Sequence, residues 1–270
     1  MSDQRKAYAS DLTDNQWAWL EPQLEDQLTQ NRLGRPMELE LREVMNTILY
    51  VVRNGVAWAN VPHDLLNPNS VYYHFRKWCL DGTWRYLNRA LRRYDRLQRK
   101  RPPAPSAAII DSQSVKTTET GGIRGYDAGK KVTAPRGFPK RHIVVDTLGN
   151  LLEVVVHAAN IQDYHGAKCV LHKVTETVDT LQRIWADGMY EKNGLVEWVR
   201  DTLHIALDVV KRPPNQQGFI IVPRRWIVER TFAWLGRYRR LSKDYERCTL
   251  SSEGMIYVAS LHTMLRRIPA

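Results

Sequence analysis

The chain has 270 residues, of which 43% are hydrophobic and 26% are charged, a composition that supports a packed core and excludes wholesale disorder. Its 40 Lys and Arg against 29 Asp and Glu leave a net charge of +11, which favours a polyanionic partner, most simply nucleic acid. No segment approaches the roughly 20 apolar residues of a membrane-spanning helix and the first residues lack a signal-peptide pattern, so we expect a cytoplasmic, nucleoid-associated protein with no membrane partner.

The N-terminal third of the chain has helical patterns. Thr13, with Gln16 three positions later, forms a capping-box pattern that predicts a helix beginning just after Thr13. A second helix is predicted over residues 41–54, because its apolar residues recur at helical spacing and an Asn-Gly pair ends it. Ser70 is the expected N-cap of a third helix, and Gly82 separates that helix from a fourth.

Two short helices joined by a tight turn resemble a helix-turn-helix, whose second helix enters the major groove of DNA. That helix carries Tyr73, Arg76 and Lys77 away from its apolar face, so these side chains are the candidates for DNA contact. Residues 76–101 hold 10 basic and 2 acidic residues, a net charge of +8 that is typical of a surface following phosphates. An ordinary helical bundle with solvated charged faces is the alternative.

The proline-rich segment RPPAPSA divides the chain. We expect a helical DNA-binding domain over residues 1–101, a linker over 102–107 and a second domain over 108–270. In the second region we predict a strand over 107–110, a hairpin around DTLGN, strands at RIWA and IALDVV, and helices over 164–181, 194–202 and 226–238. This alternation predicts an α/β fold, a mixed sheet with flanking helices.

Three acidic residues stand out in the second region. Asp111 and Asp187 each end a buried strand, and strand ends of α/β sheets are where ligand sites form. Glu229 falls in a helix that is apolar nearly all round, where a carboxylate is costly unless it is paired or bound to a cation; an (i, i+4) pair with Arg225 is the alternative. Together the three favour a hard divalent ion such as Mg²⁺, and two ions about 3.5–4 Å apart would serve phosphodiester chemistry. Asp146 is a competing ligand, although its hairpin position favours a turn role.

At these residues the sequence resembles the DDE transposases of bacterial insertion sequences, within the insertion-sequence-five family of the four/five grouping. The resemblance spans almost the whole chain, in the stretches LTDNQWAWLEP, GRPMELELREVMNTILYVVRNGVAW, IDSQSVK, DAGKKV, KRHIVVDTLGNLLEVVVHAANIQD, ADGMY and PRRWIVERTFAWLGRYRRLSKDYE. It implies a ribonuclease H-like catalytic core, a mixed sheet with flanking helices, preceded by a small all-α helix-turn-helix-like domain.

The family's two Asp and one Glu fall on Asp111, Asp187 and Glu229. The resemblance implies that these residues hold two Mg²⁺ ions, for which Mn²⁺ would substitute. It implies a transposase that cleaves double-stranded DNA at terminal inverted repeats and joins the freed 3′-hydroxyl ends to target DNA. Because two ends are cut and joined, a homodimer assembled on DNA is expected.

Basic residues near the carboxylates are candidates for DNA phosphate contacts. They are Lys130, Lys131, Lys140, Arg141, Arg224, Arg225, Arg230 and Arg237. The wider grouping often shows Tyr-x2-Arg-x3-Glu-x6-Lys around its glutamate; here Val222 replaces the Tyr, and Gly236, followed by Arg237, stands at the Lys position. Residues 132–139 form a longer, Pro-rich stretch that has no functional account.

Two other classes of function stay open at this point. One is a DNA-binding repressor whose catalytic core is silent, against which the intact acidic triad weighs. The other is a ribonuclease H-like nuclease that hydrolyses nucleic acid without strand transfer, because both chemistries use the same metal ions.

Overall fold

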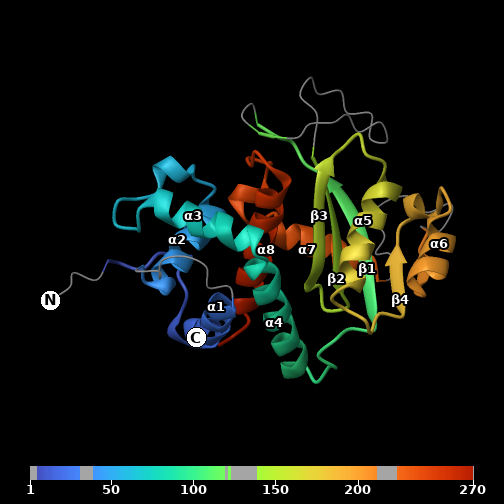
Figure 1. The fold of residues 1–270 in the computed structure, drawn as a ribbon, viewed down its shortest axis with the longest axis horizontal. Helices are drawn as coiled ribbons and strands as arrows, with labels where there is room; N and C mark the ends of the chain where they lie inside the picture. The colour runs from blue at the N-terminus through green and yellow to red at the C-terminus, as the bar shows by residue number, and fades with distance from the viewer. Residues whose placement is uncertain (1–4, 31–38, 119–120, 123–138, 212–223, 270) are drawn as a thin grey trace.

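The computed structural model describes residues 5–30, 39–118, 121–122, 139–211 and 224–269. Helices α1 to α4 gather on one side of the molecule and the sheet on the other, with α7 and α8 between them (Figure 1). The helices are α1 (Asp14–Gln30), α2 (Leu41–Asn54), α3 (Pro68–Leu80), α4 (Thr83–Gln98), α5 (Asp163–Thr175), α6 (Leu195–Trp198), α7 (Trp226–Leu235) and α8 (Thr249–Leu265). The strands are β1 (Ala107–Ser114), β2 (Pro139–Asp146), β3 (Leu151–Ala158), β4 (Arg183–Ala186) and β5 (Ala206–Val209).

Local signals at the helix ends are confirmed with one correction. The hydroxyl of Thr13 accepts from the Gln16 backbone N–H at 3.3 Å, while the Gln16 side chain accepts from the Thr13 N–H at 3.2 Å, which completes the capping box. Gly55 ends α2 with φ of 72°, a conformation that favours glycine. Ser70 is not the N-cap of α3: Asn67 caps it, and Pro68 begins the helix because its missing N–H costs nothing there.

The sheet is mixed and has helices beside it, as expected from the sequence. Its strand order is β3-β2-β1-β4-β5, with β1, β2 and β3 antiparallel and β1, β4 and β5 parallel. The two classes of connection explain the mixture, because a tight hairpin joins antiparallel strands whereas parallel ones need a crossover such as the one through α5. The first strand is longer than expected and carries Asp111 within it rather than at its end.

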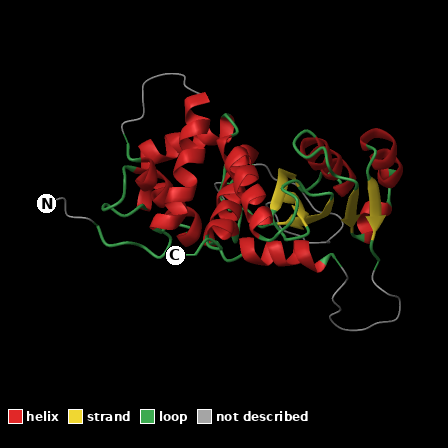
Figure 2. Ribbon diagram, turned by 90° about the horizontal axis from the view of Figure 1, so that it is seen from below, coloured by secondary structure: helices red, strands yellow, loops and turns green. Residues whose placement is uncertain are grey.

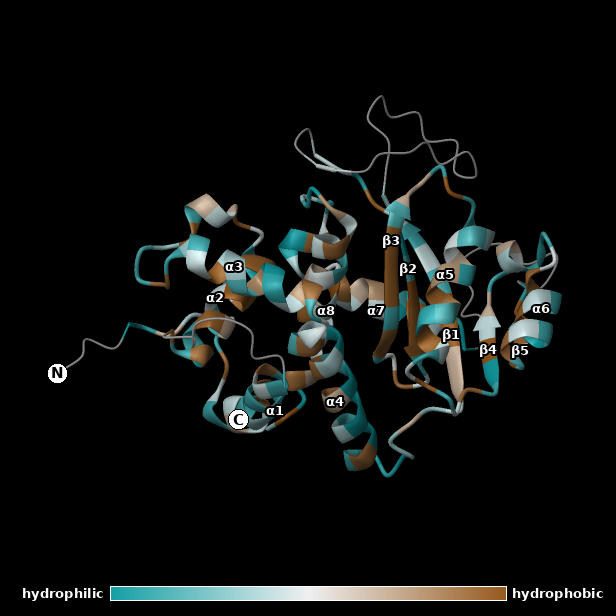
Figure 3. Ribbon diagram, in the orientation of Figure 1, coloured by the Kyte–Doolittle hydropathy of each residue, from teal (hydrophilic) through white to brown (hydrophobic). Residues whose placement is uncertain are grey.

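Helices cover both faces of this sheet (Figure 2). The face towards α7 and α8 carries Ile109, Ile143 and Trp185. The opposite face, towards α5 and α6, carries Ile110 and Val144. Strands β2 and β3 are accordingly buried along almost their whole length, and most of β3 colours as hydrophobic in Figure 3. No helix in the described part of the chain is long and apolar enough to cross a membrane.

Helix α8 was absent from the sequence expectations. It is buried on nearly every side, so it shows no amphipathic stripe by which a surface helix is recognised. It packs against α2, α3 and α4 as well as against β3. One apolar cluster therefore runs from the N-terminal helices through α8 to the sheet, across the proposed boundary at residues 102–107. The division into two domains stays a prediction.

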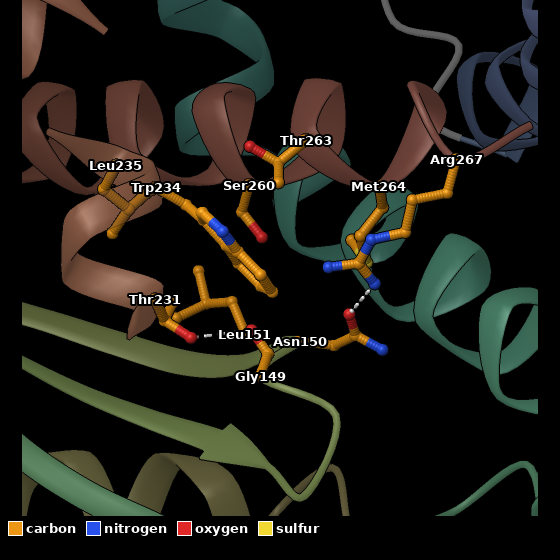
Figure 4. A pocket seen from close by; sticks show the side chains of 10 residues that line it. All are labelled: Gly149, Asn150, Leu151, Thr231, Trp234, Leu235, Ser260, Thr263, Met264 and Arg267. Carbon is orange, nitrogen blue, oxygen red and sulfur yellow. Dashed lines mark hydrogen bonds between the residues drawn. The ribbon is translucent and has the colours of Figure 1, made fainter. Parts of the chain in front are cut away.

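The hairpin turn between β2 and β3 explains Asp146. Its carboxylate accepts from the backbone N–H groups of Leu148 and Asn150 at 2.8 and 2.9 Å and pairs with the buried Arg96 at 2.8 Å. The adjoining Gly149 has φ of 85°, and a Cβ there would lie about 3.0–3.2 Å from side chains of α7, including Trp234 (Figure 4). Asp146 thus acts as a turn residue, as its position indicated.

Candidate active site

The three acidic residues come from three different elements and converge at one edge of the sheet. Asp111 lies in β1, Asp187 directly follows β4, and Glu229 lies in the first turn of α7. Strands β1 and β4 are parallel neighbours with Ile109 paired to Trp185, and Asp111 and Asp187 each follow two residues later along their own segment. Neighbouring strands lie about 4.8 Å apart, so the two carboxylates share one short stretch of the sheet.

Each aspartate is oriented by its own backbone. The Ser112 N–H donates to Asp111 Oδ1 at 2.8 Å, and the Met189 N–H donates to Asp187 Oδ1 at 2.9 Å. The second bond is an N-cap, because Asp187 begins the 3₁₀ turn Gly188–Glu191. These bonds hold each side chain while leaving further oxygens of the carboxylates open to other partners.

Arg225 links the other two carboxylates. Its Nη2 lies 3.8 Å from Asp187 Oδ2 and 3.5 Å from Glu229 Oε1, and its side chain is only 19% exposed. The (i, i+4) pair with Glu229 is the alternative that the sequence offered, and the contact with Asp187 was not anticipated. Arg225 therefore supplies positive charge between two of the three acids.

The three acids lie close enough to affect one another's charge. Burial, and after it the charges of Asp187 and Glu229, raise the pKa of Asp111 to about 6, against the opposing effects of the Ser112 N–H and Arg225. A carboxyl whose pKa is raised by burial and by like charges in a cleft is typical of a functional site.

Glu229 does not sit in an apolar environment, contrary to the sequence argument. Its side chain is 44% exposed, because the buried residues of α7, among them Ile227 and Val228, lie on the opposite side of the helix. The apolar composition of the helix is explained partly by Trp226, which stays 39% exposed. The reason to single out Glu229 is thus its place beside Asp187 and Arg225, not burial.

The predicted phosphate contacts divide into two groups. Lys140 and Arg141 are buried, which corrects the prediction for both: Lys140 pairs with Asp163 at 3.0 Å, and Arg141 donates to the Leu241 carbonyl at 2.9 Å. Arg224 and Arg237 are exposed beside or beyond α7. Lys130 and Lys131, the stretch 132–138 and Val222 lie outside the described residues.

Arg230 lies between two aromatic rings on α7. Its guanidinium is 4.6 Å from the centre of the Trp226 ring and 4.4 Å from that of Trp234, and it donates to the Leu148 carbonyl at 3.0 Å. Burial and the charge of Arg267 lower its pKa. Arg224 stacks similarly on Trp185, 4.2 Å from the ring centre. Such cation–π contacts hold a guanidinium in place at the surface.

The candidate residues of α3 differ in exposure. Tyr73 is 62% exposed, and Lys77 is half-buried. Arg76 points into the protein, where it donates to the Ser251 hydroxyl at 2.9 Å at the start of α8. Of the three, Tyr73 presents the most surface to a partner.

Sequence reasoning missed several polar residues behind the acids, among them Ser112, Asp163 and Tyr190. A signal was present, because β2 begins with the consecutive polar residues 140–142 although the whole strand is buried, and β1 ends in a polar run at residues 111–114. Buried strands usually read as continuous apolar runs.

The three carboxylates have the chemistry of a divalent-metal site, but their side chains are not yet gathered around one point. Within the described residues, no three His, Cys, Asp or Glu side chains already form a group that could hold a metal ion. Three carboxylates nevertheless fit Mg²⁺ or Mn²⁺, which choose oxygen ligands. A bound cation would offset both the burial and the like charges that raise the pKa of Asp111.

Two families match the sequence. Residues 102–263 match the family described as "Transposase DDE domain", and residues 12–88 match the one described as "Putative transposase of IS4/5 family". A curated relative from Burkholderia cepacia, "Putative transposase for insertion sequence element IS402", is 30% identical over 115 residues, covering 40% of this chain and 54% of the relative. The chain thus spans about half the length of that relative.

Solved structures show more distant likenesses. The Drosophila P element transposase strand transfer complex shares 12% identity over 71% of this chain and 48% of its own, with a TM-score of 0.31. The Mos1 mariner paired end complex with Mn shares 10% identity over 98% of this chain and 80% of its own, with a TM-score of 0.33.

Proposed function

Because this chain belongs to the IS4/5-type family of transposases with a DDE domain, we propose that it cuts DNA at the ends of an insertion sequence and joins those ends to target DNA. Asp111, Asp187 and Glu229 are the catalytic carboxylates of this proposal. The observation that carries it is their convergence: Asp111 and Asp187 each lie two residues beyond the paired Ile109 and Trp185 of adjacent parallel strands, and Arg225 lies between Asp187 and Glu229.

The three carboxylates would hold Mg²⁺, for which Mn²⁺ substitutes. When bound, two such ions stabilise the negative charge that develops on the attacking and leaving oxygens of a phosphodiester. The chain's own residues supply the frame. The strands fix the two aspartates, α7 brings Glu229 to them, and Arg225 stays within reach of both carboxylates and of an incoming phosphate.

The exposed side of α7 offers a path for the DNA backbone away from the carboxylates. Arg224, Arg225, Arg230 and Arg237 lie along this helix or beside its ends, and Glu229 is the acid among them. Arg230 and Arg224 are already held by aromatic rings, so they lose little further freedom when they contact phosphate. On α3, Tyr73 and Lys77 are the proposed contacts to the terminal inverted repeats. A homodimer on DNA completes the proposal, since two ends must be cut.

A test compares the protein with its Glu229→Gln variant on a labelled duplex that ends in the terminal inverted repeat flanking the coding sequence, with Mg²⁺ and a target plasmid. We expect cleaved and joined product from the parent protein and a loss of more than about 100-fold in the variant, beyond what is usual for residues that only support a metal ligand. Glu197→Gln, a change at another exposed glutamate, is the matched control and should leave the products unchanged.

The other outcomes contradict the proposal in distinguishable ways. Cleavage without joining would indicate a nuclease. Tight and specific binding of the duplex with no product from either protein would indicate a repressor. Equal product from the parent protein and Glu229→Gln would remove Glu229 from the active site.

A further inference from the structure

A buried polar cluster lies on the opposite face of the sheet from the proposed catalytic carboxylates. Helix α5 covers that face. Towards one end of the sheet the side chains beneath α5 are apolar, among them Ile110 and Val144. From Asp111 towards the other end the side chains beneath α5 are polar although they remain covered. The cluster, called here the polar scaffold, consists of Ser112, Lys140, His142, His157, Asp163 and Tyr190.

Asp163, in the first turn of α5, is the centre of the polar scaffold. Its Oδ1 accepts from the Ser112 hydroxyl at 3.1 Å and pairs with Lys140 Nζ at 3.0 Å, and His142 Nε2 lies 3.7 Å away. These three partners come from β1 and β2. One carboxylate therefore ties the strand that carries Asp111 to its neighbour and to α5.

Helix α5 packs closely against this cluster. The rings of His142 and His157 stack with centres 4.8 Å apart, and a Cβ at Gly166 would lie 2.4 Å from His142 Nε2 and 2.2 Å from His157 Nε2. Only a glycine at this position lets the helix approach so closely. The close approach brings Asp163, one turn earlier, within reach of both strands.

Tyr190 connects the polar scaffold to the second catalytic aspartate. It belongs to the same 3₁₀ turn that Asp187 caps, its ring is 2% exposed, and its hydroxyl lies 3.4 Å from His142 Nδ1. Asp111 immediately precedes Ser112, and Asp187 lies three residues before Tyr190. The polar contacts between the two carboxylates thus run from Asp111 and its neighbour Ser112 through Asp163 and His142 to Tyr190, in the turn that Asp187 caps.

We propose that the polar scaffold is a positioning device that fixes the spacing of Asp111 and Asp187 for a shared divalent cation. Hydrogen bonds depend on distance and angle, so polar contacts fix the position of the strand relative to the turn. Apolar packing alone would leave that position less defined. Groups behind metal ligands have this effect in other metal sites, where their loss weakens metal binding about 10–100-fold. The proposal rests on the proposed function, because it takes the two aspartates as metal ligands.

Tyr190→Phe is the sharpest test, because it removes one hydroxyl and keeps the buried ring. Binding of Mn²⁺ to the protein without DNA is measured by electron paramagnetic resonance, beside the cleavage assay. We expect Mn²⁺ affinity to fall about 10-fold and cleavage to need correspondingly more metal, with the maximal rate partly restored at saturating Mn²⁺. Ser112→Ala removes the hydroxyl that donates to Asp163 at the other end of this chain of contacts. It should have the same effect and serves if Tyr190→Phe fails to fold.

Tyr238→Phe is the matched control. Tyr238 is also a buried tyrosine, and its hydroxyl hydrogen-bonds with the Thr263 hydroxyl at 3.0 Å near α8, away from the carboxylates. It should lose stability much as Tyr190→Phe does but keep its Mn²⁺ affinity. If Tyr190→Phe and Ser112→Ala bind Mn²⁺ within twofold of the parent protein, the polar scaffold has no positioning role.

The parent protein separates this failure from that of the proposed function. If the parent protein binds no Mn²⁺, or binds it no more tightly than Glu229→Gln does, the proposed metal site is wrong and the proposed role of the polar scaffold is wrong too. If that binding is present and the two hydroxyl variants leave it unchanged, the polar scaffold alone is overturned.

Discussion

At the scale of single residues, Asp111 shows how a proposed catalytic group weakens the fold that carries it. Its carboxyl is partly covered and lies beside two other acids, so the ionised form is disfavoured in the folded protein. The folded-state pKa of about 6 lies above the ordinary value of 3.8, which means that the native state holds a proton more tightly than the unfolded chain. The free energy of unfolding therefore falls as pH rises from about 4 to 6 and stays lowered above that range.

Asp111→Asn should remove this cost. Without divalent metal, we expect the variant to be more stable than the parent protein above pH 6 by about 1–3 kcal/mol, and we expect the gain to vanish below about pH 4. Urea unfolding between pH 4 and 8 in EDTA measures the difference. A variant that is less stable than the parent protein at pH 7, or a gain that is independent of pH, would contradict this account.

At the scale of elements, the first turn of α5 is set by the two histidines beneath it. Gly166 is buried in the helix, and the clash of an added Cβ is with rings that are themselves stacked and covered, so they have little room to move. Alanine is the better helix former by about 1 kcal/mol, which opposes the clash. We expect the clash to outweigh the gain in helix propensity, because an added Cβ would displace two rings at once. The free energy of unfolding should therefore fall.

Gly166→Ala is therefore expected to destabilise the protein by about 1–3 kcal/mol in spite of its helix propensity. Gly236→Ala at the end of α7 is the matched control: its φ of −62° suits alanine, and an added Cβ would meet carbonyl oxygens only at 3.4–3.5 Å. That variant should be neutral or up to about 1 kcal/mol more stable. The midpoints of urea unfolding decide, and Gly166→Ala unfolding at or above the parent midpoint would refute the close seat of α5.

At the scale of the whole molecule, α8 packs between the N-terminal helices and the sheet, two parts that lie far apart in the sequence. The last described helix packs against α2, α3 and α4, and its Glu253 accepts from the Val156 N–H of β3 at 3.0 Å. A further link runs through Arg267, which pairs with Asp95 of α4 at 2.9 Å and donates to Asn150 in the hairpin at 2.6 Å. The N-terminal helices thus complete their core with residues from the far end of the chain.

A fragment of residues 1–101 should accordingly fail to fold by itself. It lacks the helix that covers Phe75 and Leu87, so much of its apolar surface would stay in water. We expect broad, non-cooperative thermal melting by circular dichroism, in contrast to a sharp transition of the full chain. A sharp transition of the fragment would show that the proposed domain boundary marks an independent folding unit.

Much of the local structure followed from the sequence, because its causes are local. The capping box at Thr13, the glycine that ends α2, the hairpin around Asp146 and the order of strands and helices all depend on residues that are close in the chain. The place of Asp111 and Asp187 at one level of the sheet was also foreseeable, since parallel strands bring equivalent ends together.

What the sequence did not determine is which face of each element is covered, since this depends on partners far away in the chain. Lys140 and Arg141 are buried because α5 and the segment before α8 close over them, and Glu229 is exposed because the sheet takes the other side of α7. Helix α8 gave no periodic signal because it is surrounded on all sides. Composition and spacing thus determined the elements and the acidic residues, whereas long-range packing alone decided their surroundings.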